Sequence, residues 1–402
     1  MLWGASGFTG RLVARHLARV APTHLRWALG GRNSAKLTAL RAELARINPD
    51  LAGLPLLLGD NDDAESMHRV AGQARVVCST VGPYLRYGTP LVRACVEAGT
   101  HYCDLSAEIP WIRWIVDRFH DEARRKRTRI VPACGFDAIP SDLGTLALQE
   151  HALQAYGRYC SEVTHAVGPI LGGVSGGTVA SLLGVLDHVE RHPELRRLLR
   201  KTHSLAPGFD AVPAGPEAPA PEWHRGLECW TVPTLMGTIN ANVVNRSNAL
   251  LGFAYGRSFR YREVARAATY ARAALMKAGL HMAEALVSSR AMRNVLRRVL
   301  PKPGRGPSEW MLRRGYFRTA LWGVVPAHNG EPSSVVCGTI RARGDPGYSA
   351  TSRMLAESAL LLALDLASDQ GGVLTPAVAF GLPLIERLCS AGIAVNIVTR
   401  AP

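Results

Sequence analysis

A glycine-rich turn near the start of the chain restricts its fold more than any other feature. Gly4, Gly7 and Gly10 are spaced three residues apart, after a short apolar run and before a stretch with helical periodicity. This spacing lets backbone approach a pyrophosphate, while the helix that follows offers unpaired N–H groups and its positive dipole end. We therefore predict a dinucleotide-binding turn in which Gly4, Gly7, Gly10 and the intervening Ser6, Phe8 and Thr9 hold the cofactor. A plain strand-to-helix turn is the alternative.

The first 150 residues alternate short apolar runs with amphipathic runs, which is typical of β-α-β units on a parallel sheet. Strands are expected at 25–29, 54–58, 75–80, 101–104 and 129–133, and helices at 8–21, 34–47, 88–98, 110–126 and 140–154. With a first strand before the glycines, this pattern predicts a doubly wound Rossmann domain over residues 1–155. Only three residues precede the glycines, whereas a strand has about 5–6 residues. We expect a truncated first strand and a natural start upstream of Met1.

The second half of the chain predicts a mixed α+β domain over residues 156–402, for substrate binding and dimerisation. Antiparallel strands are expected within 227–262 and 316–343, helices at 261–298 and 349–368, and a loop at 206–223. The uncharged stretch 166–186 has the length of a membrane span but contains Pro169 and six glycines, so it predicts a strand, a turn and a helix start. The C-terminal helices are expected to pack back on the Rossmann domain.

The end of the second predicted strand indicates which cofactor is bound. An acidic residue there would bind the ribose 2′-hydroxyl of NAD, but this chain has Arg32 and Asn33 after two glycines, with Lys36 nearby. A guanidinium at this place suits a 2′-phosphate, so NADP(H) is predicted over NAD. A merely solvated Arg32 is the alternative. Asp60 and Asn61 follow the third strand and are candidate adenine contacts, although Asp60 could equally cap the next helix.

The candidate reaction site lies where later strands end. Thr80, Val81, Gly82 and Pro83 follow the fourth strand and are expected to line the nicotinamide crevice. Tyr84 and Tyr87 could polarise a carbonyl or donate a proton, or they could simply pack. Asp137 lies between an apolar run and a helix start, where a raised pKa would let it donate a proton. Ser141 or Asp142 as a helix N-cap would explain part of that run instead.

Other classes of function are less well supported. Gly173 to Gly177 matches the nucleophile elbow of serine hydrolases, with Ser175 as nucleophile, but Asp187, Asp210, His281 and His328 do not follow recognisable strands. A helix cap at Ser175 or Thr178 is the simpler interpretation. No paired Cys/His spacing appears, so no metal is expected.

Charge and cysteine use limit the partners. The net charge is +15, and because the chain has only five lysines, nearly all of its positive charge comes from arginine. A positive net charge suits an acidic partner. A coding bias toward arginine would also produce this charge. The basic runs 196–201 and 290–305 lack interleaved aromatics, so nucleic acid is not expected. Eight cysteines without a C-x-x-C pair favour the reducing cytoplasm. Peripheral contact with the inner face of the plasma membrane stays open.

With these residues in place, the chain resembles the saccharopine dehydrogenase-like oxidoreductases, and more narrowly the trans-acting enoyl reductases of lipid and polyketide assembly. The matching stretches run nearly end to end, and each is short but together they are specific: 4–10, 31–33, 81–84, 87–88, 101–104, 135–144, 175–178, 246–250 and 345–357. Ala107 departs from the glycine that this family has before the acidic residue.

The resemblance implies reduction of an activated double bond on a carrier-bound or lipid-like acyl chain, in glycolipid or related biosynthesis. NADPH would deliver hydride to the β-carbon of an unsaturated thioester while a donor such as Tyr84 stabilises the enolate oxygen. It further implies an acyl carrier protein or polyketide synthase as partner, and a homodimer is considered. A non-catalytic NADP-sensing protein and a hydrolase using Ser175 are the alternatives.

Overall fold

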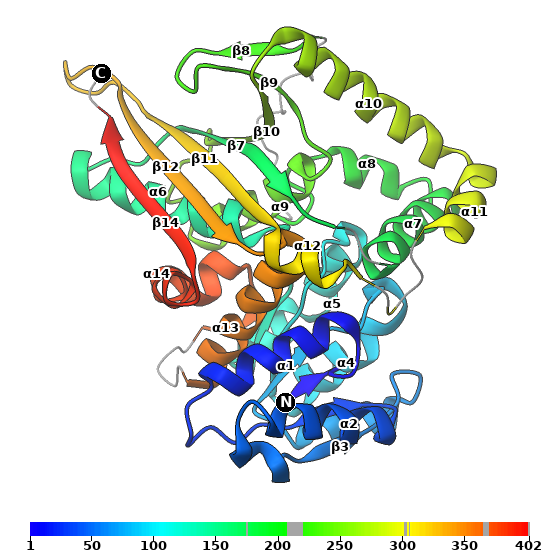
Figure 1. Ribbon diagram of the computed structural model, residues 1–402. Coiled ribbons are helices and arrows are strands. Elements are labelled where there is room, and N and C mark those ends of the chain that lie inside the picture. Colours follow the sequence, from blue (N-terminus) through cyan, green and yellow to red (C-terminus); the bar gives the residue numbers. More distant parts are fainter. Residues whose placement is uncertain (174–175, 207–219, 301–303, 305, 365–369, 401–402) are drawn as a thin grey trace.

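Two sheets organise the molecule. The computed structural model describes residues 1–173, 176–206, 220–300, 304, 306–364 and 370–400. Within these residues one seven-stranded sheet has the order β13-β6-β5-β4-β1-β2-β3 and a second has the order β14-β12-β11-β7-β10-β9-β8. Figure 1 shows the N-terminal half, in blue and cyan, below the second sheet, with α13 and α14 between the two.

The first sheet is parallel throughout and carries the predicted Rossmann order 3-2-1-4-5-6. Its strands are β1 (Leu2–Trp3), β2 (Leu29–Gly31), β3 (Leu56–Leu58), β4 (Val76–Ser79), β5 (His101–Cys103) and β6 (Arg129–Val131). The helices are α1 (Phe8–Val20), α2 (Ser34–Ala45), α3 (Ala64–Gly72), α4 (Tyr84–Ala98), α5 (Ile109–Arg125) and α6 (Ile139–Tyr156), with a 3-10 turn η1 at Pro49–Gly53. The two-residue β1 lies mid-sheet, with Leu2 and Trp3 each 1% exposed.

Two local expectations in this half were wrong. The second strand begins at Leu29, not at residue 25, because 25–28 lie outside the ladder. Helix α4 begins at Tyr84 rather than at residue 88, because Pro83 supplies its N-cap position. Tyr84 and Tyr87 therefore lie in the first turn of a helix.

The second sheet is mixed. It contains β7 (Glu162–Leu171), β8 (Glu222–His224), β9 (Cys229–Pro233), β10 (Arg260–Ala267), β11 (Tyr316–Val325), β12 (Ser334–Arg343) and β14 (Ile393–Arg400), and β7 pairs with β10 in parallel while the other ladders are antiparallel. Around it are α7 (Gly176–Arg191), α8 (Leu195–Arg200), α9 (Gly237–Leu250), α10 (Tyr270–Ser288), α11 (Arg290–Val299), α12 (Glu309–Arg314), the π-helical turn η2 (Pro346–Ala350), α13 (Thr351–Leu364) and α14 (Pro376–Ser390). The stretch 166–186 forms the predicted strand and helix start, and residues 174–175 lie outside the description.

Three expectations for the second half were wrong. Residues 237–250 form helix α9 where strands were expected, because burial of most of its side chains overrides the strand preference of its Val, Ile and Thr residues. Residues 261–267 belong to strand β10, although a helix was expected from residue 261. Helical structure then breaks at Ser289, whose backbone is extended and whose hydroxyl accepts a hydrogen bond from Met292 N at the start of α11. The expected loop 206–223 overlaps β8 at its end, and 207–219 lie outside the description.

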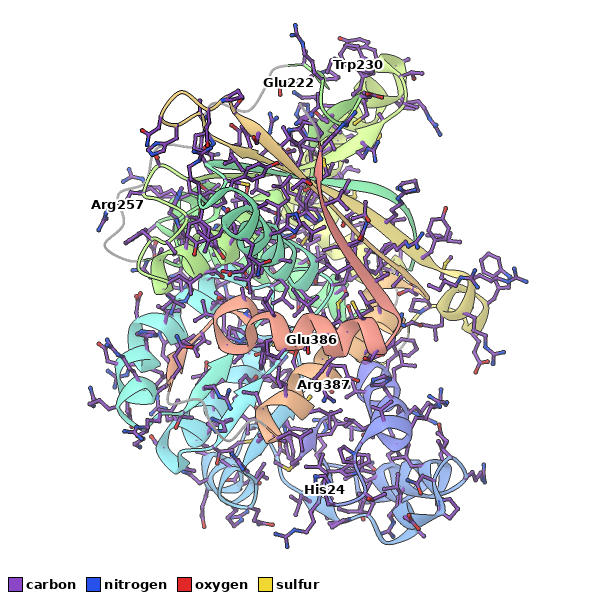
Figure 2. The ribbon with its side chains drawn as sticks, turned by 90° about the vertical axis from the view of Figure 1, so that its left-hand side faces the viewer. His24, Glu222, Trp230, Arg257, Glu386 and Arg387 are labelled. Carbon is purple, nitrogen blue, oxygen red and sulfur yellow. The ribbon has the colours of Figure 1, made fainter. Side chains whose placement is uncertain are left out.

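The C-terminal part returns to the first sheet. Strand β13 (Gly372–Val373) pairs in parallel with β6. Glu357 of α13 lies 2.7 Å from His16 Nε2 of α1 and accepts a hydrogen bond from Arg387 Nε of α14 at 2.8 Å. Figure 2 shows Arg387 on the side of α14 that faces α13. Helices α13 and α14 thus attach helix α1 to the rest of the molecule. The division into two domains at residue 155 stays a prediction.

Among the described helices, none combines the length and the apolar content needed to cross a bilayer.

Candidate active site

The glycine turn is shaped by close backbone approaches. Gly4 has a φ of +78°, and a Cβ there would lie 2.6 Å from the Val81 Cγ2 atom beyond β4. A Cβ on Gly10 would lie 2.9 Å from Ala5 Cα and would clash with the Gly4 carbonyl. Side chains at these two positions would therefore force the turn apart. The N–H of Gly7 donates to Gly4 O at 2.9 Å and closes the turn.

The start of α1 remains open for an anion. Gly7 is the N-cap residue, its backbone is extended, and among the described residues no side chain caps this helix end. Unpaired N–H groups of the first turn and the helix dipole together favour a phosphate. Ser6, Phe8 and Thr9 are half-buried around this position.

The carboxyl end of β2 is cationic. Arg32 and Lys36 are exposed, and neither side chain has a hydrogen-bond or ion-pair partner among the residues that the structure describes. Asn33 caps α2, because its Oδ1 accepts a hydrogen bond from Lys36 N at 2.9 Å. The arrangement can accept a 2′-phosphate and offers no carboxylate for a 2′-hydroxyl.

The two adenine candidates lie beside the glycine turn. The Asn61 side chain accepts a hydrogen bond from Trp3 Nε1 at 2.9 Å and donates one to Tyr87 O at 2.8 Å, so it ties β1 to α4. Asp60 is exposed and accepts from Asp62 N at 3.2 Å. The suggestion that Asp60 caps the next helix was wrong, since Asp63 caps α3.

The loop after β4 joins the turn to α4. The Thr80 hydroxyl donates to Gly4 O at 3.1 Å, and the Gly82–Pro83 peptide is cis. The N–H groups of Tyr84 and Leu85 donate to the Glu108 carboxylate at 2.9 and 2.8 Å, so this helix end is already occupied by an anion.

Tyr84 is buried and its hydroxyl is engaged. The hydroxyl donates to Ser79 O at 3.3 Å and accepts from Leu105 N at 3.2 Å. Burial, with the nearby Asp104 carboxyl, raises the pKa of Tyr84 well above its ordinary value. This geometry favours a packing role, and a catalytic role for Tyr84 stays a prediction. Tyr87 is half-buried beneath the guanidinium of Arg86.

Asp137 lies in the loop between β6 and α6. Residue 137 as a whole is exposed. Protein nevertheless surrounds the carboxyl closely, and this loss of water raises its pKa to about 6, with the negative charge of Glu263 adding to the rise. The idea that Ser141 or Asp142 caps α6 was wrong, because no side chain caps this helix. Asp142 instead accepts hydrogen bonds from Ser247 Oγ and from Ala377 N at the start of α14.

The sequence did not predict the buried polar cluster that lies behind Asp137. The Glu263 carboxylate on β10 accepts hydrogen bonds from Ser141 Oγ at 2.9 Å and Asn240 Nδ2 at 2.7 Å, and His165 Nδ1 lies 3.3 Å away. Burial alone would raise the pKa of Glu263, but the hydrogen bonds from these partners outweigh it and lower the pKa. No sequence signal could have found this cluster, since residue 263 was expected on a helix.

The second domain lies directly over the glycine turn. The Phe8 ring meets Tyr348 of η2 edge to face at 5.3 Å between centroids, and Tyr348 OH lies 2.9 Å from Thr178 Oγ1 of α7. Asp345 accepts hydrogen bonds from Gly173 N and from Tyr348 N and orders this region. Residues of both halves of the chain therefore meet beside the glycine turn.

The hydrolase alternative gains no support from the described residues. Ser175 and Asp210 lie outside them. Asp187 is paired with Arg293 and Arg297, and His281 and His328 are exposed on α10 and in the turn between β11 and β12. No Asp–His pair is thereby formed from these candidates.

An open helix start, a turn that only glycines permit and a cationic β2 end define a class, the NADP-dependent oxidoreductases with a Rossmann domain. Residues 1–131 match the family described as saccharopine dehydrogenase NADP binding domain. A relative in Mycobacterium tuberculosis is 39% identical over 413 residues, 98% of this chain and 96% of its own length. Trans-acting enoyl reductases of Mycobacterium leprae and Mycobacterium ulcerans are each 36% identical, again over 98% of this chain and 96% of their own.

The chain therefore belongs to the saccharopine dehydrogenase-like oxidoreductases, in the group of the trans-acting enoyl reductases, and it is an NADP-dependent enzyme. The fold agrees. Saccharopine dehydrogenase (L-Glu forming) of Saccharomyces cerevisiae superposes with a TM-score of 0.56 at 14% identity, over 100% of this chain and 99% of that one. At this identity the likeness describes the architecture alone.

Proposed function

We propose that this protein is a trans-acting enoyl reductase that reduces the activated C=C bond of a carrier-bound or lipid-like acyl thioester in lipid or polyketide biosynthesis. The names of its relatives support the reaction class. The observation that carries the proposal is Asp137, an exposed residue whose carboxyl has a raised pKa, in a loop at the same carboxyl edge of the sheet as the glycine turn. A hydride reduction needs these two things together, a cofactor site and a proton donor.

The residues present fit NADPH. A Cβ would fill the space at Gly4 and Gly10, the α1 start is uncapped, and Arg32 is free of partners among the described residues. We assign the pyrophosphate to residues 4–10, the 2′-phosphate to Arg32, Asn33 and Lys36, the adenine side to Asp60 and Asn61, and the nicotinamide side to residues 80–83. NADPH, when bound, supplies a hydride.

Reduction of the activated C=C bond adds one hydride and one proton to the substrate. NADPH held by the glycine turn and Arg32 would supply the hydride that the β-carbon of the enoyl thioester takes up, and Asp137 would give the proton that bonds to the α-carbon as the carbonyl is restored. The products are the saturated thioester and NADP⁺, and Asp137 regains its proton from solvent. An acid with a pKa near the working pH is suited to this transfer.

The test is NADPH absorbance with a panel of enoyl thioesters, with and without acyl carrier protein. Asp137→Asn should lower kcat by roughly 10²–10⁴-fold and leave NADPH affinity unchanged, whereas the exposed Asp121→Asn on α5 should match the parent. Since Asp137 donates only when protonated, kcat/KM of the parent should fall with rising pH above about 6, and Asp137→Asn should lack this limb.

Two results would contradict the reductase proposal, and a third would contradict only the role of Asp137. Tight NADPH binding without turnover of any thioester would favour an NADP-sensing protein. Cofactor-independent hydrolysis blocked by a serine-directed phosphonate would favour the hydrolase. Unchanged kcat in Asp137→Asn would remove Asp137 from the reaction while leaving the reductase assignment in place.

A further inference from the structure

Helices α10 and α11 leave most of their apolar side chains uncovered. Of the nineteen residues of α10 only Ala273 and Lys277 are buried, and of the ten of α11 only Arg293. The exposed fractions reach 74% for Leu275, 62% for Met282 and 76% for Val299. A helix of a globular protein normally buries an apolar stripe against the core, so two consecutive helices of this kind indicate a surface that meets something else.

The two helices form an outer edge of the second domain. Figure 1 shows α10 along the upper right edge of the molecule and α11 at its lower end, beside α7. On the inside, α10 packs on β9 and α7, and α11 packs on α7. Trp310 on α12 adds a further large side chain that is 61% exposed.

This edge is also strongly basic. Six cationic residues stand on α10 and α11 against one acidic residue, Glu284: Arg272, Lys277, Arg290, Arg293, Arg297 and Arg298. Asp187 and Glu190 of α7 face the pair Arg293 and Arg297 and neutralise part of that charge. Arg290 and Arg298 are exposed and have no hydrogen-bond or ion-pair partner in the described part of the chain.

We propose that α10 and α11 dock on an anionic lipid surface, with Leu275, Met282 and Val299 entering the headgroup boundary and Arg290 and Arg298 meeting lipid phosphates. Apolar side chains with flanking arginines are the pattern of helices that lie in a membrane interface. A second copy of the chain fits less well, because it would bring two basic edges together. Leu275, Met282 and Val299 are exposed on helices at an outer edge of the molecule (Figure 1), which a bilayer can cover without a matching surface.

The lipid-facing edge and the candidate active site share helix α7. The outer helices pack on α7, and its first turn holds Thr178, whose hydroxyl bonds to Tyr348 beside the glycine turn. Helix α7 thus leads from the proposed lipid-facing edge, at Asp187 and Glu190, to the glycine turn, at Thr178. The docking itself needs neither cofactor nor turnover, so it can fail while the reductase proposal stands.

The experiment is co-sedimentation of the full chain with vesicles of phosphatidylcholine alone, or of phosphatidylcholine mixed equally with phosphatidylglycerol. Binding to the anionic vesicles is expected, weakening with added salt. Arg290→Glu with Arg298→Glu should reduce affinity at least about tenfold, and Leu275→Asp with Val299→Asp should do the same. The matched controls are Arg93→Glu on α4 and Leu58→Asp on β3, both exposed positions in the first domain, which should bind as the parent does.

Circular dichroism and NADPH affinity, unchanged in all variants, would exclude misfolding. Absence of binding to anionic vesicles would overturn the proposal, as would equal binding to both vesicle types that no variant alters. Self-association in sedimentation velocity that Leu275→Asp abolishes, or capture of an acidic carrier protein by this edge without vesicle binding, would likewise overturn it in favour of that other occupant.

Discussion

The choice between the two nicotinamide cofactors can be tested at Arg32. Its guanidinium is exposed at the carboxyl end of β2 and has no partner among the described residues, so Arg32→Ala should leave the fold intact. A hydrogen bond to a charged group contributes about 1.5–3 kcal/mol, and solvent screening at an exposed site reduces this to about 1–2 kcal/mol. Because about 1.4 kcal/mol is a factor of ten, the Kd for NADPH should rise about tenfold.

The Kd for NADH should not change, since it lacks the 2′-phosphate. Titration of both cofactors against the parent and the variant measures the difference directly, and higher salt should shrink the NADPH effect. Arg26→Ala is the matched control, because Arg26 is also exposed but precedes β2 at the opposite edge of the sheet. Equal losses for NADPH and NADH, or an equal loss in Arg26→Ala, would refute the assignment of Arg32 to the 2′-phosphate.

Three further perturbations address the turn, Tyr84 and the attachment of α1. Gly10→Ala should abolish measurable NADPH binding and lower the free energy of unfolding by about 1–3 kcal/mol, because the new Cβ would lie 2.9 Å from Ala5 Cα. Gly72→Ala should change neither NADPH binding nor the free energy of unfolding, because a Cβ there would have nothing within 4 Å. Tyr84→Phe should keep kcat within about threefold while costing about 1–2 kcal/mol of stability through the unpaired Leu105 N–H, and a hundredfold fall would restore the catalytic interpretation. Glu357→Ala should cost about 2 kcal/mol in urea unfolding because His16 and Arg387 lose their partner, whereas Glu386→Ala, exposed on α14 next to Arg387, should be neutral (Figure 2).

The first domain could be predicted from sequence because its signals are local. Each parallel strand is a short apolar run and each helix has its own periodicity, so the order of elements follows from the βαβ pattern. Helix α9 could not be predicted, since its Val, Ile and Thr residues favour strands and only its surroundings decide. Strand β13 is two residues long and begins with glycine, so no periodicity marks it.

The candidate site likewise has one part that could be predicted from the sequence and one part that could not. The glycine turn and Arg32 are contiguous in sequence with the elements that position them, and the structure places them as the spacing implies. The surroundings of Tyr84 and Asp137 depend on residues far along the chain, such as Glu263 beside Asp137. Long-range packing therefore decides which polar group can act, and it leaves no trace in a local pattern.

The pairing of β13 with β6 has a consequence for how the protein is made. A ribosome releases the chain from its N-terminus, so the nucleotide-binding sheet lacks its last strand until residues 372–373 emerge. Until then the backbone of β6 is an open edge that can pair with another chain. Expression of the N-terminal half alone should accordingly give aggregated material, and chaperone dependence during synthesis should end only when α13 and β13 have arrived.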